Sequence, residues 1–466
     1  MSAIPLFEVG SDEFSAFQAR LMQRAEFRDV AVGPSPPELL ARAKATGDAE
    51  FAAFAETFCA GLPHSAAATV SRVIESVQAG RDQAVRHLSR LFDGLELPSN
   101  RIKVGKMDLM KAADGVDNAL LKTCVEQVLP RLRKFHEKQK QASWQIDDTG
   151  GSVGIRVQPL NRAGLYVPGG TAFYPSTLMM TAVPAQVAGV KEIAVFTPNG
   201  AIEKSPLLAA LLLELKLEEV YRVGGAQAVA AAAIGTPNIA RVDKLVGPGN
   251  TFVALAKKQL FGRMGIDSIA GPSEVVVVFD DQADPRHVAA DLLAQAEHDT
   301  QAAAIGVTDS SDAADAVRAQ VEAQLADLPR KETAQQSMAQ FGGIIVAPSK
   351  GFALRIADAF APEHLELLTQ AAEKDADQIR QAGAIFVGAF APEAFGDYTA
   401  GPNHVLPTSG TARFASALSV QDFTRQVSII RGSRELLAAN RAAIESLARA
   451  EGLEAHARSV AVRFEG

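Results

Sequence analysis

Residues 243–260 read DKLVGPGNTFVALAKKQL, a short apolar run that ends in a glycine turn and continues as a helical segment. The same order occurs earlier in the chain, where GLYV (164–167) leads to PGG, EIAVF (192–196) to TPNG, and VYRV (220–223) to GGAQAVAAAAIG. Repeated strand, turn and helix units predict a parallel sheet with crossover helices. Ligands of such sheets bind beyond the carboxyl ends of the strands, where these turns fall.

The glycine turns themselves indicate a ligand but do not identify it. Glycine lets a ligand approach the backbone closely, and the N–H groups that begin the following helices attract anions. None of these turns contains G-x-G-x-x-G, so the usual dinucleotide fingerprint is absent. A cofactor therefore cannot be named from the glycines alone.

A second alternating segment follows the first. Strand-like runs EVVVVFD (274–280), AAAIGVT (302–308), GGIIVAP (342–348) and GAIFVG (383–388) are separated by helical runs, one of which is expected to pass through FALRIADAFAPEHLELL (352–368). This alternation predicts a second α/β domain. The expected fold class is therefore α/β, with two Rossmann-like parallel-sheet domains.

Helical segments are expected at both ends of the chain. Residues 1 to about 60 are broken by prolines, and the residues from about 413 onward are mostly polar, so neither stretch can bury a core of its own. The pattern from 65 to 145 is also helical and includes the only tryptophan, Trp144. Each terminal segment must therefore pack on another surface of this chain or of a partner.

Composition limits the class of protein. The 466 residues exceed the roughly 250–300 of a single growing core, so two or more domains are expected. The formal net charge of −8, without a run of Lys and Arg, argues against nucleic acid as a partner. The longest apolar run, LLAALLL (207–213), ends at Glu214 and is far shorter than the roughly 20 residues of a membrane helix.

The expected location is the cytoplasm. The first residues, MSAIPLFEVGSDEFS, carry acidic side chains where a signal peptide has basic ones, and no apolar segment follows them. The two cysteines, Cys59 and Cys124, lie in helix-like segments far from the polar motifs, which fits a reducing compartment. Both read as buried free thiols rather than as nucleophiles.

A glutamine and a histidine stand three positions apart in DLLAQAEHDT (291–300). On a helix, positions i and i+3 project from one face, so the Gln295 amide and the His298 imidazole could converge on a metal ion. For a single pair of this kind, a solvated helix end whose histidine satisfies a neighbouring carbonyl is the commoner explanation.

Two further motifs carry groups that can transfer protons. APEHLEL places Glu363 beside His364, two groups of different pKa at the entrance of an expected helix. The alternative is a helix N-terminus with Glu in the favourable first turn. A long glycine- and proline-broken segment contains Asp397 and His404, and such loops are usually functional. The alternative here is a turn in which Asp397 caps the backbone.

Several motifs together resemble the histidinol dehydrogenase family, and they occur in that family's order over roughly residues 65–466. They are LYVPGGTAFYPSTLMMTAVPA, GGAQAVAA, DKLVGPGN, AGPSEV, QAEHD, APEHLE, GDYTAGPNHVLPTSGTARF and EGLEAHARSV. The first sixty or so residues match less well, so the resemblance assigns no functional role to them.

The resemblance implies a zinc enzyme that oxidises L-histidinol to L-histidine in two NAD-dependent steps through an aldehyde, the last steps of histidine biosynthesis. By motif, the zinc ligands, which also contact substrate, are Gln295, His298, Asp397 and His456. Mixed oxygen and imidazole ligation suits zinc that must admit a substrate. Such a metal would orient the amino alcohol more than activate water.

The resemblance also assigns the remaining site residues. His364 is implied as the general base for both oxidations and as a substrate contact, while Glu363 is implied to activate water for attack on the aldehyde. The other implied substrate contacts are Ser273, His404 and Glu451, and the implied NAD contacts are Tyr166, Gln227 and Asn250. The family's cofactor domain is an incomplete Rossmann type, which explains the missing fingerprint.

The pattern and the resemblance together predict the domain organisation and a homodimer with shared active sites. The expected parts are an N-terminal helical extension (1–60), a catalytic α/β domain (61–165 and 275–412), an NAD-binding incomplete Rossmann-like domain (166–274) and a C-terminal tail that exchanges between subunits (413–466). The tail is expected to cross because it cannot form a core alone and because the family's dimers interlock.

Two rival functions fit the same fold. A relative could oxidise another alcohol, such as a sulfonated or hydroxylated propanediol, although a carboxylate at Glu451 suits a cationic substrate and repels a sulfonate. A catalytically silent binding protein is the second rival. The presence of every implied zinc and proton-transfer position argues against it, because a scaffold alone does not require those side chains.

Overall fold

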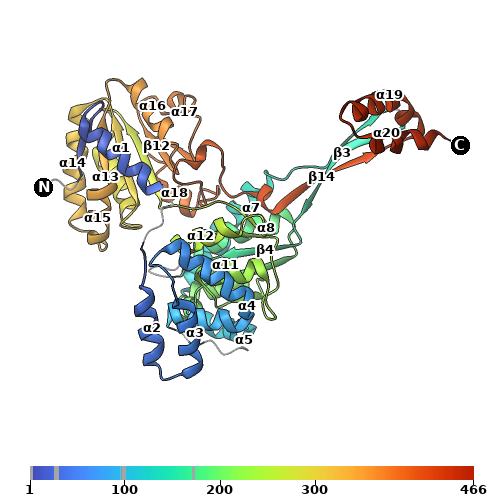
Figure 1. The fold of residues 1–466 in the computed structure, drawn as a ribbon. Helices are drawn as coiled ribbons and strands as arrows, with labels where there is room; N and C mark the ends of the chain where they lie inside the picture. Colours follow the sequence, from blue (N-terminus) through green and yellow to red (C-terminus); the bar gives the residue numbers. More distant parts are fainter. Residues whose placement is uncertain are drawn as a thin grey trace.

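The computed structural model of the chain describes residues 4–25, 31–94, 96, 101–148, 150–169 and 174–465. Two α/β bodies lie side by side, and an arm leads away from them to a small pair of helices at the C-terminus (Figure 1). Parts of the expected N-terminal extension and residues 170–173, where the PGG turn ends, lie outside the described residues.

The first α/β body is built on a five-stranded parallel sheet with the strand order β6-β5-β4-β7-β8. This confirms the parallel sheet that the strand, turn and helix repeats predict. Its strands are β4 (Arg162–Tyr166), β5 (Glu192–Phe196), β6 (Glu219–Tyr221), β7 (Lys244–Val246) and β8 (Gly265–Ile266), and its helices are α8 (Pro175–Ala188), α9 (Ala201–Lys204), α10 (Pro206–Glu214), α11 (Gly225–Ile234) and α12 (Thr251–Leu260).

One glycine turn of this body shows why glycine is needed. Gly247 follows β7 with φ +114°, a conformation that other residues rarely adopt. A Cβ atom at this position would lie 2.2 Å from the carbonyl oxygen of Tyr166 at the end of β4. The turn therefore lets two strand ends approach closely at the carboxyl edge of the sheet.

The second α/β body has a six-stranded parallel sheet with the order β1-β11-β10-β9-β12-β13. The strands are rich in Val, Ile and Leu because helices cover the sheet on both faces. The elements are β9 (Glu274–Phe279), α13 (Pro285–Ala296), β10 (Ala303–Thr308), α14 (Ser311–Leu325), α15 (Lys331–Phe341), β11 (Gly343–Val346), α16 (Lys350–Phe360), β12 (His364–Leu368), α17 (Ala372–Ala376), β13 (Ala384–Val387) and α18 (Glu393–Tyr398).

The N-terminal residues differ from the expected helical extension. β1 (Leu6–Glu8) joins the six-stranded sheet beside β11, and α1 (Asp12–Ala25) packs on the same body. Phe7 on the strand stacks on Phe17 of α1 with 4.5 Å between ring centroids. A three-residue strand is too short to show an alternating pattern, so the sequence does not predict this part of the second body.

The helices that precede the first sheet also differ from their expected place. α4 packs on α11 and α12, so its apolar face completes the core of the first body rather than of the catalytic domain expected for 61–165. The helices of this region are α2 (Pro36–Ala45), α3 (Ala49–Cys59), α4 (Ala66–Asp93), α5 (Lys106–Ala113), α6 (Asn118–Thr123) and α7 (Leu129–Glu137). Across the described ranges, the chain has no helix long and apolar enough to cross a membrane.

The helix expected through 352–368 is corrected by the structure. α16 stops at Phe360, where Ala361 takes a left-handed conformation with φ +48°, and Pro362 follows it. Proline cannot continue the helical hydrogen bonds, and the buried HLELL run forms β12, an inner strand between β9 and β13. Glu363 and His364 therefore stand at the start of a strand, not at a helix entrance.

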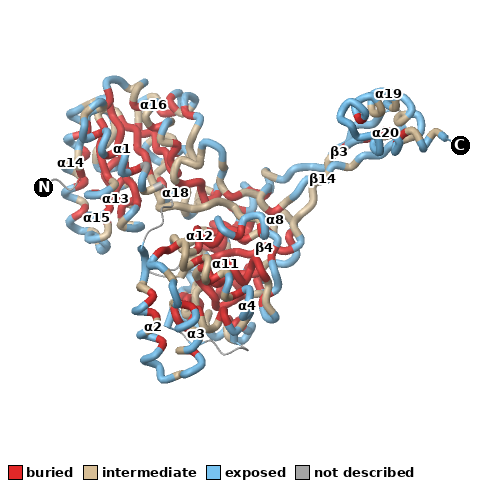
Figure 2. The backbone as a smooth tube through the Cα atoms, viewed as in Figure 1, coloured by how far each residue is buried: buried red, intermediate tan, exposed pale blue. Residues whose placement is uncertain are grey.

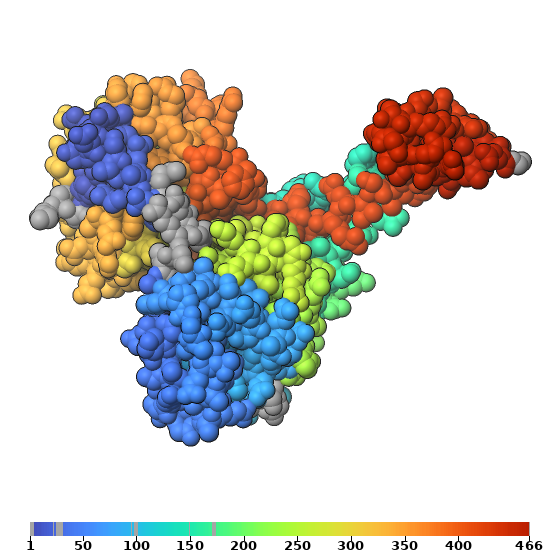
Figure 3. All heavy atoms as spheres, viewed as in Figure 1, coloured from blue at the N-terminus to red at the C-terminus, as the bar shows by residue number. Residues whose placement is uncertain are grey.

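The arm contains three strands, and one of them, β14 (Thr424–Arg431), lies in the C-terminal segment where helices were expected. β2 (Trp144–Asp148), β3 (Gly151–Pro159) and β14 form an antiparallel sheet with the order β14-β3-β2. It leads to α19 (Arg434–Ala450) and α20 (Glu454–Ala461), which we call the C-terminal module. The arm and the C-terminal module are largely exposed and stand apart from both bodies (Figures 2 and 3).

Candidate active site

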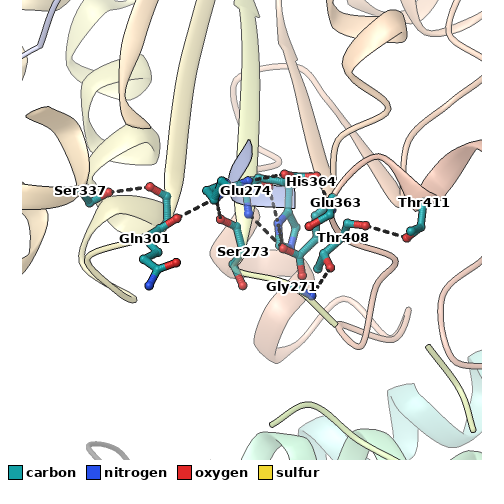
Figure 4. Close-up of polar contacts among 12 residues, drawn as sticks. Gly271, Ser273, Glu274, Gln301, Ser337, Glu363, His364, Thr408 and Thr411 are labelled. Carbon is teal, nitrogen blue, oxygen red and sulfur yellow. Dashed lines mark hydrogen bonds and ion pairs between the residues drawn. The ribbon is translucent and has the colours of Figure 1, made fainter. Parts of the chain in front are cut away.

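A cluster of polar side chains lies at the amino edge of the six-stranded sheet. Glu274 begins β9 and His364 begins β12, and these strands are neighbours with His364 opposite Val275. Figure 4 shows Ser273, Glu274, Glu363 and His364 gathered at these strand starts. The first sheet instead presents its glycine turns at the carboxyl edge, so only that sheet follows the usual rule for ligand sites.

The Glu363–His364 pair is held by one backbone segment. The N–H group of Glu274 donates to Glu363 Oε2 at 3.0 Å, and the carbonyl oxygen of Glu274 lies 3.3 Å from His364 Nδ1. With a proton on Nδ1, His364 donates to that carbonyl and leaves Nε2 free to accept a proton. His364 Nε2 is buried and has no hydrogen-bond partner among the described residues.

Three carboxylates surround the His364 imidazole. Its Nδ1 lies 3.9 Å from Glu363 Oε2 and 3.7 Å from Glu393 Oε1, and its Nε2 lies 3.6 Å from Asp397 Oδ1. Burial lowers the pKa of His364, but the charges of Glu393, Glu363 and Asp397 outweigh burial and hold that pKa well above 6.5. The cluster therefore stabilises the protonated form of His364.

The carboxyl groups respond differently to this environment. Burial raises the pKa of Glu363 to about 7 and that of Glu393 to about 8. Burial also raises the pKa of Asp397, but contact with His364 more than offsets it, and the net pKa of Asp397 is lowered. Groups with separated pKa values in one site can divide acid and base roles.

Asp397 and His404 lie together, as their shared segment suggested. Asp397 sits on α18, and its backbone oxygen is 3.0 Å from His404 Nδ1. His404 Nε2 lies 3.4 Å from the Thr177 hydroxyl of α8, which belongs to the other α/β body. The loop between them thus connects the site to the first sheet.

A group of possible metal ligands lies beside His364. One donor atom each of His298, Glu393 and Asp397 lies within 4.8 Å of the others. Gln295 is fully buried, and in the orientation that satisfies its hydrogen bonds its amide nitrogen donates to both Glu393 oxygens, at 3.1 and 2.8 Å. Imidazole and carboxylate donors at this spacing fit zinc. Three of the four expected ligand positions, those of Gln295, His298 and Asp397, therefore lie in one neighbourhood.

Gln295 and His298 do not lie on one continuous helix, although their spacing suggested it. α13 ends at Ala296, and His298 lies in the turn beyond it, where its Nδ1 contacts the Ala294 carbonyl at 2.9 Å. The helix begins at the capping residue Asp284 with Pro285 in its first turn. The helix thus buries Gln295, while the turn leaves His298 less buried than Gln295.

Glu451 and His456 do not join this cluster within the chain. Both are exposed, Glu451 at the end of α19 and His456 on α20. The C-terminal module that carries them stands at the far end of the arm from α18 (Figure 1). A site that uses both groups of residues must therefore obtain Glu451 and His456 from another subunit or from a large movement of the arm.

The expected cofactor contacts gather at the carboxyl edge of the first sheet. The backbone N–H of Gly225 donates to the Tyr166 hydroxyl at 3.0 Å, and Gln227 lies in the first turn of α11. Asn250 caps α12, accepting hydrogen bonds from Phe252 and Val253 at 3.1 and 3.2 Å. Strand ends, glycine turns and helix starts of this kind suit a phosphate-bearing ligand.

Sequence analysis missed several members of the site. Glu393 precedes Asp397 by one helical turn in APEAFGDY, a spacing that could have been recognised. Glu366 follows His364 by two strand positions, is buried, and accepts a hydrogen bond from the Glu393 N–H at 2.6 Å. Arg24, which contacts Glu274, had no local signal because the two residues lie 250 positions apart.

Comparisons with known proteins find close relatives of this chain. A family model described as histidinol dehydrogenase matches residues 62–464. The chain is 47% identical over 399 residues to histidinol dehydrogenase of Bacillus subtilis, covering 85% of this chain and 92% of that protein. It is 47% identical over 429 residues to that of Agrobacterium fabrum, covering 91% and 98%. The crystal structure of histidinol dehydrogenase from Elizabethkingia anophelis is similar with a TM-score of 0.83 at 30% identity, covering 100% and 99%.

Proposed function

This chain belongs to the histidinol dehydrogenase family, and on that premise we propose that it oxidises L-histidinol to L-histidine in two NAD-linked steps through L-histidinal. Family membership makes it a dehydrogenase that acts on histidinol in histidine biosynthesis. The observation that best supports the two-step proposal is the Glu363–His364 pair, because one backbone segment holds both a carboxyl group and an imidazole.

His364 is the proposed base of both oxidations. Its Nε2 is buried and lacks a hydrogen-bond partner among the described residues, so it can receive the proton of the substrate hydroxyl. The surrounding carboxylates stabilise the imidazolium that results. The same nitrogen, once it has released that proton, can take the proton of the aldehyde hydrate in the second oxidation.

Glu363 is the proposed base for water attack on the aldehyde. Its pKa of about 7, raised by burial, places the carboxyl between its neutral and ionised forms near neutral pH. The ionised form can remove a proton from water, and the N–H of Glu274 keeps the carboxylate in place. The two adjacent residues thereby serve different steps of one reaction sequence.

The proposed zinc ligands are Gln295, His298 and Asp397, together with His456 from a second subunit. The close approach of His298 to Asp397, and the burial of Gln295 beside Glu393, support this set. Bound zinc would act as a Lewis acid that orients the amino alcohol. Ser273 and His404 are proposed to contact the substrate from the rim of the cluster.

The proposed NAD contacts are Tyr166, Gln227 and Asn250. Their position at the carboxyl edge of the first sheet supports this role, since Gly247 and Gly225 bring backbone close to the same region. Bound NAD would accept the hydride that each oxidation releases. The loop that joins His404 to Thr177 would keep the substrate cluster against this edge.

A homodimer with shared sites is proposed because the C-terminal module is incomplete by itself. Of the 17 residues of α19, only Ala448 is buried. Apolar side chains remain exposed on the arm and the C-terminal module, among them Ile430 (78% exposed) and Leu447 (66% exposed). Such surfaces are typical of subunit interfaces. A second subunit would cover them and receive Glu451 and His456 at its His364 cluster, which we define as His364, Glu363, Glu393 and Asp397.

The substrate class is supported by Glu451. A carboxylate delivered to the site suits an imidazole-bearing or cationic substrate, and it repels the sulfonate of the rival alcohol. A silent binding protein would need neither the buried Glu363–His364 pair nor the adjacent possible metal ligands.

Stoichiometric oxidation tests the proposed function. Purified protein supplied with zinc, NAD and limiting L-histidinol should form two NADH for each histidinol consumed, with L-histidine as product. A sulfonated propanediol under the same conditions serves as the comparison substrate. One NADH per histidinol would contradict the two-step proposal, and oxidation of the propanediol alone would contradict the substrate assignment.

A further inference from the structure

A buried arginine from the N-terminal helix reaches the amino edge of the six-stranded sheet. Arg24 lies in the last turn of α1, and its side chain is only 2% exposed. One guanidinium nitrogen lies 2.5 Å from Glu274 Oε2. The other donates to the backbone oxygens of Ser273 at 3.2 Å and Gln301 at 2.7 Å. The guanidinium therefore binds the backbone at the amino ends of two adjacent strands, β9 and β10.

The residue that Arg24 binds is the one that holds the proton-transfer pair. Glu274 donates its N–H to Glu363, and its carbonyl oxygen faces His364 Nδ1. Its second carboxylate oxygen accepts from the Ser409 N–H at 2.9 Å. Figure 4 shows this network running from Gln301 and Ser273 through Glu274 to Glu363 and His364. Among the described residues, the hydrogen bonds of Arg24 go to Ser273, Glu274 and Gln301 and not to Glu363 or His364.

We propose that Arg24 is a positioning residue for Glu363 and His364, acting through the Ser273–Glu274 backbone, so that the N-terminal helix is part of the active site. The inference rests on the proposed roles of Glu363 and His364. A planar guanidinium can bind one carboxylate and two carbonyls at once, which fixes the backbone in both position and direction. A misplacement of about 1 Å at a reacting group lowers rates by about 100-fold.

Charge balance gives Arg24 a second effect on the same pair. The Glu274 side chain is only 12% exposed, and the described cation within hydrogen-bond distance of its carboxylate is Arg24. Glu363 already faces the charges of His364, Glu274 and Asp397, and Arg24 offsets the negative charge of Glu274. Loss of the positive charge of Arg24 favours the protonated form of Glu363, because a nearby positive charge favours the ionised form of a carboxyl group. Glu363 would then lose its proton only at a higher pH.

The alternative is that Arg24 only anchors α1. The neighbouring Arg20 offers a matched control, because it lies on the same helix, is exposed, and contacts the Phe17 ring at 5.8 Å rather than the cluster. An anchor would change the amount of folded enzyme but leave the pH dependence of the folded fraction unchanged. A positioning residue changes the rate and the pH dependence of the folded fraction.

The test compares Arg24→Met with Arg20→Met in the full-length zinc-loaded protein. We expect Arg24→Met to lower kcat per folded site about tenfold or more, and to move the acid limb of L-histidinal oxidation upward by about half a pH unit or more. Arg20→Met should keep the wild-type kcat and pH profile. A wild-type kcat and pH profile in folded Arg24→Met would overturn the inference.

A second variant covers the case in which Arg24→Met does not fold. Arg24→Met combined with Glu274→Gln leaves no lone buried charge, so this protein should fold, yet it lacks the hydrogen bonds of Arg24 to Ser273 and Gln301. Its kcat should still be about tenfold or more below that of Glu274→Gln alone. Equal kcat values in these two proteins would overturn the inference. Inactivity of the wild type and of Arg20→Met would instead reject the proposed function.

Discussion

The His364 cluster and the C-terminal module differ in how completely one chain builds them. Around His364, the carboxyl groups of Glu363, Glu393 and Asp397 lie within 3.9 Å of the ring nitrogens, and the backbone N–H of Glu274 holds Glu363 in place. On the C-terminal module, Glu451 and His456 are exposed and far from those partners (Figure 1). In the proposed function, proton transfer is preorganised within one subunit, whereas the last metal and substrate contacts are delivered by the C-terminal module.

This difference has a physical basis. Groups whose pKa values depend on burial need a fixed, water-poor environment, and the centre of a parallel sheet provides it. A metal ligand or a substrate contact needs only to arrive in the correct geometry, so it can be carried on an exposed helix. In the proposed function, the residues around His364 transfer protons, and the C-terminal module supplies contacts across the dimer.

Metal removal should have the largest effect, because zinc is proposed to join the two regions. Treatment with a chelator should abolish turnover, and added zinc should restore it. Zinc affinity should fall toward acid pH, since the imidazoles of His298 and His456 must be neutral to bind. The checks are NADH formation and elemental analysis, with a chelator already saturated with zinc as the control. Full turnover by metal-free protein would remove the proposed link.

Substitutions at the proton-transfer pair should separate the two steps within the first region. His364→Ala should slow both oxidations about 100-fold to 10,000-fold, because one base serves both. Glu363→Gln should slow oxidation of added L-histidinal more than oxidation of L-histidinol to the aldehyde. Single-turnover kinetics with each substrate measures the two steps. Equal losses in Glu363→Gln for both substrates would contradict the division of roles.

A smaller effect is expected on the stability of the folded protein, because Glu363 in the first region is buried. Burial raises the pKa of Glu363 from 4.5 to about 7, so the folded state holds this proton more tightly than the unfolded state. The stability that Glu363 contributes is complete below pH 4.5 and is lost as pH rises through 7. Glu363→Gln resembles the neutral acid, so at pH 8 it should be more stable than wild type by up to about 3 kcal/mol.

Urea unfolding of the metal-free proteins at pH 4.5 and pH 8 checks this prediction. The gain from Glu363→Gln should be present at pH 8 and absent at pH 4.5. Glu451→Gln on the exposed C-terminal module is the matched control and should change stability little at either pH. A gain of the same size at both pH values would show that charge burial is not its cause.

The sequence pattern predicted the two parallel sheets because each repeat carries its own local signal of strand, turn and helix. It could not predict β1, which has three residues and forms only because β11 is available to pair with it. It also extended the helix of α16 into β12, since the apolar run at 364–368 fits either structure and only burial between β9 and β13 decides. The sequence pattern therefore fails for elements whose structure depends on partners far away in the sequence.

The site followed the same rule. Motif resemblance indicated Glu363, His364 and Asp397, and the structure places these three side chains together. Glu393 lies one helical turn from Asp397 and was recognisable from spacing alone. Arg24 was not, because its partner Glu274 lies 250 positions away in the sequence. Site residues within one motif can be predicted from the sequence, whereas a contact between residues far apart in the sequence is seen only in the folded structure.

Complementation between inactive subunits tests most directly whether the two regions meet across a dimer. His364→Ala and His456→Ala chains, each inactive alone, are refolded together so that about half the dimers are mixed. If the C-terminal module acts in the partner, each mixed dimer has one site with both lesions and one with neither, and roughly a quarter of wild-type activity should return. If mass spectrometry detects mixed dimers but no activity returns, the C-terminal module serves its own chain and the shared site is contradicted.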